Sequence, residues 1–172
     1  MGLAVGDVRA GARNRLTGGS RGAGSVTGVA AIETRSARPA PTRAEAGPLS
    51  YPGARRPDRR RTVDTSGISL AVWEWGDEAA PPILFAHGGF DFAGTFDTLA
   101  PLVADAGYRV VSWDQRGHGD SGSAHLYSWE ADVRDALAVV DSTGARSLPV
   151  VGHSKGGSLM LHLAESMPHR VS

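Results

Sequence analysis

From residue 62 onward, short runs of apolar residues alternate with longer segments of helical periodicity. The apolar runs are PPILFA, YRVVSW and LPVVGH, at residues 81–86, 108–113 and 148–153. Continuous apolar runs of this length are typical of strands buried on both faces, and helices between them form right-handed crossovers. The alternation therefore predicts an α/β fold with a mostly parallel sheet and flanking helices.

Three helices are expected between and after these runs. The first covers residues 96–106 with Gly107 as its stop, and the second begins after the N-cap Ser128 and stops at Gly144. The third follows the last apolar run and ends at Pro168. The buried faces of the first two helices are predicted to consist of Phe96, Leu99, Leu102 and Val103, and of Trp129, Val133, Ala136, Leu137 and Val140.

The first 61 residues differ from the rest of the chain. Residues 1–62 contain twelve arginines, four acidic residues and few large apolar side chains. Such a segment buries too little apolar surface to offset its loss of conformational entropy, so residues 1–61 are interpreted as a disordered extension. A transit peptide and an extension from a misplaced translation start remain open alternatives. Residues 62–172 then form one domain, which begins with a β-hairpin around Ser66-Gly67.

Composition narrows the classes of partner. Eighteen basic and eighteen acidic residues give a formal net charge of zero, which indicates no polyanionic partner. The cluster RRPDRRR at residues 55–61 is better explained as a solvated tail than as a nucleic-acid or lipid contact. The chain has no cysteine and no apolar run approaching the roughly 18 residues of a membrane span. We expect a cytoplasmic protein that binds neither nucleic acid nor membrane.

Glycine-rich motifs accompany the ends of all three apolar runs. HGG stands at residues 87–89, WDQRGHGDSG at residues 113–122 and GHSKGG at residues 152–157. The carboxyl ends of parallel strands share one edge of a sheet, where open α/β folds bind their ligands. Together the motifs resemble the α/β-hydrolase fold family, in particular its serine-nucleophile esterase and haloperoxidase-like branch. The resemblance covers about residues 62–172, and it implies the N-terminal portion of that fold.

The stretch Gly152-His153-Ser154-Lys155-Gly156 has the G-x-S-x-G form of a nucleophile elbow. In this strand-to-helix turn the glycines leave room for neighbouring backbone, and the serine side chain is exposed above the sheet. We expect Ser154 to be the nucleophile and to have strained backbone angles. The N–H of Lys155 can stabilise a tetrahedral oxyanion. The resemblance implies that the second donor is the N–H of Gly89, with Phe90 as the alternative.

Further residues are expected to support the site or line its pocket. His87 is predicted to hold the oxyanion loop by hydrogen bonds, as the resemblance implies. Asp114, Arg116 and His118 are predicted to brace the loop after their strand, and a structural role is favoured for them. The full supporting set is His87, Phe90, Asp114, Arg116, His118 and His153. Asp91 and Asp97 are candidates for the pocket lining, and Asp97 is equally a candidate helix cap.

No histidine of the chain is a credible general base for Ser154. His162 lies eight residues further along the same predicted helix, about 12 Å away along its axis, and His169 is further still. The His153 side chain is expected to point away from the serine across the turn. In the family that the sequence resembles, the acid and the histidine follow later strands, which would lie beyond Ser172. The chain is therefore expected to be truncated before them and to be inactive by itself.

The sequence thus predicts a serine hydrolase that attacks an ester or related carbonyl carbon and forms an acyl-serine. A serine nucleophile disfavours the epoxide-hydrolase and haloalkane-dehalogenase chemistry of relatives that use Asp there. No metal and no organic cofactor is implied, and the partner is a small ester-like molecule. The alternative is a catalytically inactive binding or interaction protein on the same scaffold. Self-association is expected through the LPVVGH edge and the helix side that contains Leu159, Leu161 and Leu163.

Overall fold

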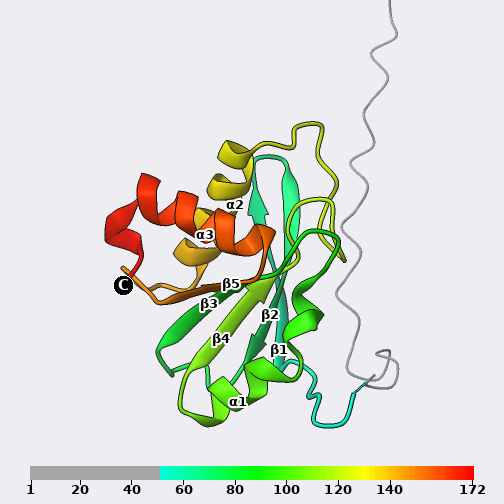
Figure 1. Cartoon of the computed structure of the whole chain (residues 1–172), viewed down its shortest axis with the longest axis vertical. Coiled ribbons are helices and arrows are strands. Elements are labelled where there is room, and N and C mark those ends of the chain that lie inside the picture. Colours follow the sequence, from blue (N-terminus) through cyan, green and yellow to red (C-terminus); the bar gives the residue numbers. More distant parts are fainter. Residues whose placement is uncertain (1–50) are drawn as a thin grey trace, which may run out of the picture. The chain divides into compact units, whose positions relative to one another are not determined.

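The computed structural model describes residues 51–172 (Figure 1). The interpretation of residues 1–50 as disordered therefore lies outside the described residues. The described part confirms the predicted α/β class, with strands and helices alternating after a first hairpin. Its elements are β1 (Arg59–Thr65), β2 (Ile68–Trp75), β3 (Pro82–Ala86), η1 (Ala93–Phe96), α1 (Leu99–Asp105), β4 (Arg109–Trp113), α2 (Trp129–Ser142), β5 (Val150–Gly152), α3 (Lys155–Ser166) and η2 (Pro168–Arg170).

The five strands form one mixed sheet in the order β1-β2-β4-β3-β5. Strand β2 pairs antiparallel with both β1 and β4, whereas β3 pairs in parallel with both β4 and β5. The three strands that precede the glycine-rich motifs are therefore parallel to one another, as their apolar runs predict. The carboxyl ends of these strands therefore lie at the same end of the sheet, which brings the three motifs together.

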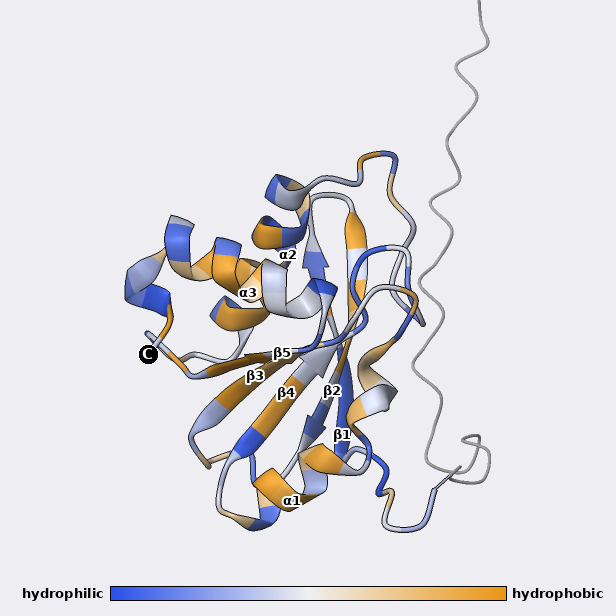
Figure 2. Ribbon diagram, in the orientation of Figure 1, coloured by the Kyte–Doolittle hydropathy of each residue, from blue (hydrophilic) through white to orange (hydrophobic). Residues whose placement is uncertain are grey.

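Helices cover both faces of the sheet (Figure 1). Leu84 of β3 and Val111 of β4 belong to a core with residues of α2 and α3. Their neighbours Phe85 and Val110 point to the opposite face, where they pack with residues of η1 and α1. Figure 2 shows hydrophobic residues along β3 and β4, as expected for strands that are covered on both faces.

The hairpin predicted around Ser66-Gly67 is confirmed, but its first strand begins at Arg59. The predicted domain boundary at residue 62 therefore falls inside β1. The Nε atoms of Arg59 and Arg61 donate hydrogen bonds to the Glu74 carboxylate on β2, at 3.1 and 2.8 Å. The interpretation of this arginine cluster as a solvated tail therefore does not hold for Arg59 and Arg61. Their carboxylate partner lies on the neighbouring strand.

The first predicted helix is divided into η1 and α1, and its predicted face is wrong in part. Leu99 and Leu102 are 46% and 63% exposed. The buried residues of α1 are instead Ala100 and Pro101. The break between the two helices shifts the helical phase, so that one stripe cannot continue across it. Gly107 has a φ of 95° and stops the helix as predicted.

Helix α2 begins as predicted, with the Oγ of Ser128 accepting a hydrogen bond from the N–H of Ala131 at 3.3 Å. Its predicted face is correct for Ala136 and Val140, whereas Trp129 is 41% exposed. The buried residues of α2 are Ala131, Asp132, Asp135, Ala136, Val139 and Val140. Two carboxylates therefore share the buried face, and an analysis of apolar periodicity does not predict them.

Helix α3 packs against the sheet directly after the edge strand β5. Leu159 and Leu163 are fully buried, so the expectation that they lack cover is wrong, whereas Leu161 is 73% exposed. Leu159 and Leu163 belong to the core that also contains residues of β3 and β5, whereas Leu161 does not. Beyond α3, Val171 forms a single parallel bridge with Leu148, the residue two positions before β5.

Candidate active site

The three glycine-rich segments meet beyond the carboxyl ends of β3, β4 and β5 (Figure 1). A Cβ atom built on Gly88 would lie 3.0 Å from Nδ1 of His153 and 3.5 Å from Cβ of Ser154. On its other side the same segment contacts the loop after β4, where the N–H of Gln115 donates to Nε2 of His87 at 2.9 Å. The HGG segment therefore lies between the serine turn and the loop that follows β4.

Ser154 lies between β5 and α3 with φ 52° and ψ −119°. Such angles cost a residue other than glycine about 1–3 kcal/mol, so the surrounding structure must maintain them. A Cβ atom on Gly152 would lie 2.5 Å from the carbonyl oxygen of Gly156, and one on Gly156 would collide with the carbonyl oxygen of Ala86. The predicted strained serine between a strand and a helix, flanked by obligatory glycines, is confirmed. Its side chain is exposed to solvent.

Backbone N–H groups beside Ser154 are available to a ligand. The N–H groups of Gly89, Phe90 and Lys155 donate to no described residue. Lys155 is the first residue of α3, where helical N–H groups have no partner within the helix. Phe90 has a φ of 62° and a fully exposed side chain. These groups could donate to an anion that forms next to the serine oxygen.

His87 is fully buried, and both of its ring nitrogens are engaged. Nε2 accepts the N–H of Gln115 at 2.9 Å, and Nδ1 lies 2.6 Å from the carbonyl oxygen of Gly88. Because Nε2 accepts, the proton of the neutral ring is on Nδ1 and is donated to Gly88. Burial lowers the pKa of His87, and this favours the neutral ring. His87 therefore has no free nitrogen that could act on Ser154.

Asp114 connects two loops at the edge of the sheet. Its Oδ1 accepts the N–H of Ala93 at 2.7 Å, and its Oδ2 accepts the N–H of Asp120 at 2.9 Å. The hydroxyl of Ser121 donates to the Asp114 carbonyl oxygen at 2.5 Å. Burial raises the pKa of Asp114, although the two backbone hydrogen bonds oppose that rise. These contacts hold the start of η1 against the loop after β4.

Arg116 forms a buried ion pair with α2. Its Nε and Nη2 donate to the two carboxylate oxygens of Asp135, each at 2.7 Å, and its Nε lies 3.6 Å from Oδ1 of Asp132. Nη1 donates to the carbonyl oxygen of Leu126 at 2.6 Å. Nδ1 of His118 lies 3.0 Å from the carbonyl oxygen of Arg116. The Arg116 side chain thus fixes the loop after β4 to α2.

The partners of the Lys155 side chain were not identified from the sequence. Nζ lies 2.9 Å from Oε1 of Gln115 and 2.9 Å from Oδ2 of Asp132. Lys155 is the chain's only lysine, and Asp132 and Asp135 lie three residues apart on the otherwise apolar face of α2. Two acidic residues on a buried helix face require cationic partners, and that pattern is the signal that could have revealed the network.

Two further histidines of the described part pack their rings on other side chains, away from the serine. The ring of His162 packs on Trp129, with ring centroids 4.9 Å apart, and His118 packs on His87 at 5.3 Å. Within residues 51–172, no histidine is hydrogen-bonded to the Ser154 hydroxyl. The described site therefore contains an exposed serine and backbone N–H groups that can bind an anion, but no histidine hydrogen-bonded to that serine.

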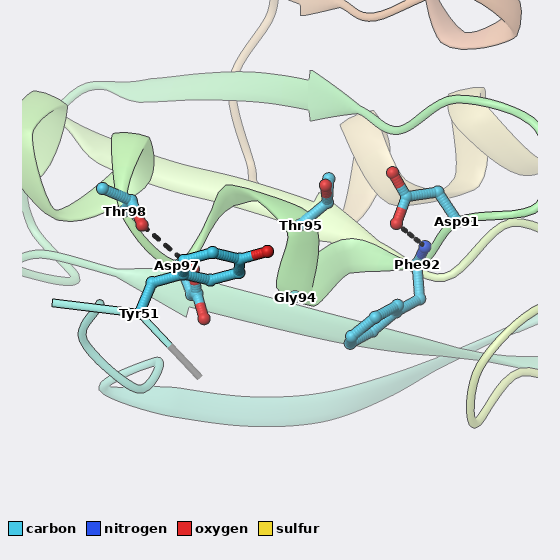
Figure 3. A pocket seen from close by; sticks show the side chains of 7 residues that line it. All are labelled: Tyr51, Asp91, Phe92, Gly94, Thr95, Asp97 and Thr98. Carbon is cyan, nitrogen blue, oxygen red and sulfur yellow. Dashed lines mark hydrogen bonds between the residues drawn. The ribbon is translucent and has the colours of Figure 1, made fainter. Parts of the chain in front are cut away.

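A cavity of about 430 Å³ lies along the segment that follows the HGG motif (Figure 3). It is lined by Tyr51, Asp91, Phe92, Gly94, Thr95, Asp97 and Thr98. Figure 3 shows that two of its acidic side chains bond to their sequence neighbours, Asp91 to the N–H of Phe92 and Asp97 to the hydroxyl of Thr98. Ser154 is not among the lining residues, so the cavity is separate from the candidate active site.

Residues 51–172 contain no group of three or more histidine or acidic side chains that could hold a metal ion. In the same part of the chain, no helix has the length and apolar character needed to cross a membrane.

The strand order, the crowded glycines and the serine turn define the class of protein. Residues 81–172 match the family model of the alpha/beta hydrolase fold. This match covers more than half of the chain, and it includes all three glycine-rich motifs. The chain therefore belongs to the alpha/beta hydrolase fold family.

Several relatives of this family resemble the chain. Epoxide hydrolase A of Mycobacterium tuberculosis is 37% identical over 99 residues, which are 56% of this chain and 31% of that protein. A serine hydrolase-like protein of Dictyostelium discoideum is 35% identical over 112 residues, 62% of this chain and 31% of that protein. The crystal structure of an epoxide hydrolase from Vigna radiata aligns with a TM-score of 0.62 and 29% identity, over 66% of this chain and 37% of that one. The chain thus spans about a third of the length of these relatives.

Proposed function

We propose that the chain carries the nucleophile and the oxyanion hole of a serine hydrolase that acts on esters or related carbonyl compounds. The observation that supports this most strongly is the strained, exposed Ser154 at the junction of β5 and α3. In the proposed reaction, the Ser154 oxygen bonds to the carbonyl carbon and its proton passes to a base. The tetrahedral intermediate then expels the alcohol, and water hydrolyses the acyl-serine to release the acid.

The oxyanion of that intermediate is proposed to bind the N–H groups of Lys155 and Gly89. Both groups lack partners among the described residues, and both adjoin Ser154 or its neighbours. The N-terminus of α3 adds a favourable dipole at the same point. Each such donor contributes about 3–4 kcal/mol to transition-state stabilisation in enzymes of this type. The exposed side chain of Phe90, next to Gly89, is proposed to line the substrate pocket as an apolar wall.

An acyl substrate explains the serine better than an epoxide does, although two of the relatives are named epoxide hydrolases. Attack of a serine oxygen on an epoxide carbon would leave an alkyl ether, which has no acyl carbon for water to attack. Attack on an ester leaves an acyl-serine, which water can hydrolyse. Residue 154 being a serine therefore favours ester-like substrates.

A second candidate function is ligand binding without turnover. It is favoured by one observation: His87, His118 and His162 are engaged with groups other than Ser154, and among the described residues no histidine is hydrogen-bonded to the Ser154 hydroxyl. A base must approach within about 3 Å of the serine oxygen to accept its proton. The two candidates agree that the 172-residue chain turns over slowly, and they differ on whether Ser154 reacts when a base is supplied.

Hydrolysis of p-nitrophenyl acetate with and without added imidazole separates the two candidates. Without imidazole, the chain is expected to be no faster than its Ser154→Ala variant. Imidazole also releases p-nitrophenolate by attacking the ester itself, so the readout with imidazole as external base is the acetyl group on the chain. We expect one acetyl group on Ser154, located by peptide mass spectrometry. Ser158→Ala, an exposed serine on the first turn of the same helix, is the matched control and should behave like the parent chain. Equal acetylation of the Ser154→Ala variant would refute the nucleophile and leave the binding function.

A further inference from the structure

Lys155 connects the serine turn with the two segments beside it. The stem of its side chain crosses Gly89, since a Cβ atom built there would lie 3.9 Å from both Cβ and Cδ of Lys155. Its ammonium group lies 2.9 Å from Oε1 of Gln115 and 2.9 Å from Oδ2 of Asp132. The Asp132 side chain is buried, so the carboxylate depends on this cation and on the more distant Arg116. The residue that provides one proposed oxyanion donor is therefore anchored through its side chain as well.

Gln115 transmits this anchor to the HGG segment. Its Nε2 donates to the carbonyl oxygen of His87 at 2.6 Å, and its N–H donates to Nε2 of the same histidine at 2.9 Å. The lysine fixes the orientation of the Gln115 amide, because Oε1 accepts from the ammonium and Nε2 is then left to donate. Main-chain and side-chain contacts with Gln115 thus hold His87 in one position and one tautomer.

His87 in turn fixes the direction of a peptide group. Its Nδ1 lies 2.6 Å from the carbonyl oxygen of Gly88. In a planar trans peptide the carbonyl oxygen and the following N–H point in opposite directions, and the described chain has no cis peptide bond. Because the Gly88 carbonyl points to His87, the N–H of Gly89 points away from it and has no partner among the described residues.

We propose that Lys155 is a positioning residue, whose ammonium acts through Gln115 and His87 to fix the Gly89 N–H as the second oxyanion donor. The inference rests on the proposed function, since it explains how that oxyanion hole is assembled before substrate binds. Lys155 then contributes to both donors: its backbone N–H at the start of α3 is one, and its side chain fixes the other, the N–H of Gly89. If Lys155 served only as the ion-pair partner of Asp132, replacing Gln115 would have no effect on the Gly89 N–H.

The test compares three variants in the imidazole-supplied acetylation of Ser154, with each variant's fold checked by circular dichroism. Lys155→Met removes the ammonium, and Gln115→Met leaves the Lys155–Asp132 ion pair intact but breaks the link to His87. Loss of one oxyanion donor slows an enzyme by about 10²–10³, so we expect both variants to acetylate at least about tenfold more slowly. The control is Asp141→Asn. Asp141 lies on α2, as Asp132 does, and forms an exposed ion pair with Arg170, so its replacement should leave the rate unchanged.

A second readout is independent of catalysis. In the parent chain, the backbone amide signal of Gly89 in an NMR spectrum should be single and sharp, and in Lys155→Met and Gln115→Met it should broaden or divide. Parent rates in Gln115→Met would overturn the positioning role while the proposed function stands, because Ser154 is still acetylated. Should Ser154 of the parent chain fail to react, the proposed function falls. In that case the Gly89 signal alone tests the positioning role of Lys155. An unchanged signal in both variants would overturn it.

Discussion

At the scale of single residues, the serine turn depends on backbone atoms that lie too close together for most side chains. Gly156 lies where a Cβ atom would collide with the carbonyl oxygen of Ala86 and come within 2.5 Å of that of His87. Both obstacles are backbone atoms of the strand end that leads into the HGG segment, so neither can move without displacing that segment. The close approach of α3 to β3 is what places Ser154 beside Gly88 and its neighbours.

This crowding predicts the effect of adding one methyl group. Gly156→Ala should lower the free energy of unfolding by about 1–3 kcal/mol or more, because overpacking against backbone forces a shift. Gly157→Ala is the matched control. A Cβ atom on Gly157 would lie 3.4 Å from the carbonyl oxygen of Gly152, which is an ordinary contact distance. In a helix, alanine is favoured over glycine by up to about 1 kcal/mol. Urea unfolding of the two variants checks the difference, and equal stabilities would contradict the described packing.

At the scale of elements, the β1–β2 hairpin is held by a buried carboxylate between two arginines. The Glu74 side chain is only 4% exposed and bonds to Arg59 and Arg61 across the strand pair. Burial alone would raise the pKa of Glu74, but the hydrogen bonds from Arg61 and Arg59 and the charges of Arg61 and Arg109 outweigh it and lower that pKa below its usual value. These contacts explain why an arginine-rich sequence forms an ordered edge strand, and charged side chains also protect such an edge from further pairing.

The lowered pKa of Glu74 has a defined consequence for stability. Because the folded state binds this proton less readily than the unfolded state, the stabilisation is present above pH 4.5 and is lost as the pH falls through the folded pKa. Glu74→Gln should reduce the free energy of unfolding at neutral pH by about 1–3 kcal/mol. In this variant the free energy of unfolding should also fall less steeply as the pH is lowered. The exposed Glu165→Gln serves as control. If the free energy of unfolding of Glu74→Gln fell with decreasing pH as steeply as that of the parent, this role of Glu74 would be contradicted.

Local patterns predicted most of the elements, and long-range contacts explain the failures. The strands, the Ser128 cap and the serine turn depend on neighbours in sequence, and the structure reproduces them. The start of β1 depends on Glu74, fifteen residues after Arg59, and the network of Lys155 depends on residues 23 and 40 positions earlier in the chain. In the region of α1, the break at residues 97–98 determines which residues face the sheet, and helical periodicity alone does not reveal such a break.

At the scale of the whole described domain, β5 leaves one edge of the sheet open beyond the single bridge between Leu148 and Val171. Val151 is 36% exposed on this edge strand, and Leu161 on the adjacent helix is 73% exposed. Unpaired N–H and C=O groups along such an edge can pair with another chain. The opposite edge, β1, bears arginines and is unsuited to the same contact.

Self-association through β5 is therefore expected, and one charge should weaken it. Val151→Lys places an ammonium on the open edge and should shift the chain toward monomer in sedimentation velocity measurements. The control is Thr62→Lys, which adds the same charge at an exposed position of β1 and should leave the parent's association unchanged. A parent chain that sediments as a monomer over the whole concentration range would rule out this contact.

The central claim is that Ser154 is the nucleophile, and the location of a covalent adduct tests it most directly. The chain is treated with a fluorophosphonate in the presence of imidazole, digested, and sequenced by tandem mass spectrometry. Covalent attachment requires the serine oxygen to displace fluoride from phosphorus, a reaction that unactivated serines undergo slowly. We predict a single modified residue, Ser154, with Ser158 four positions later unmodified. An adduct spread over several serines, or one that persists in Ser154→Ala, would contradict the account.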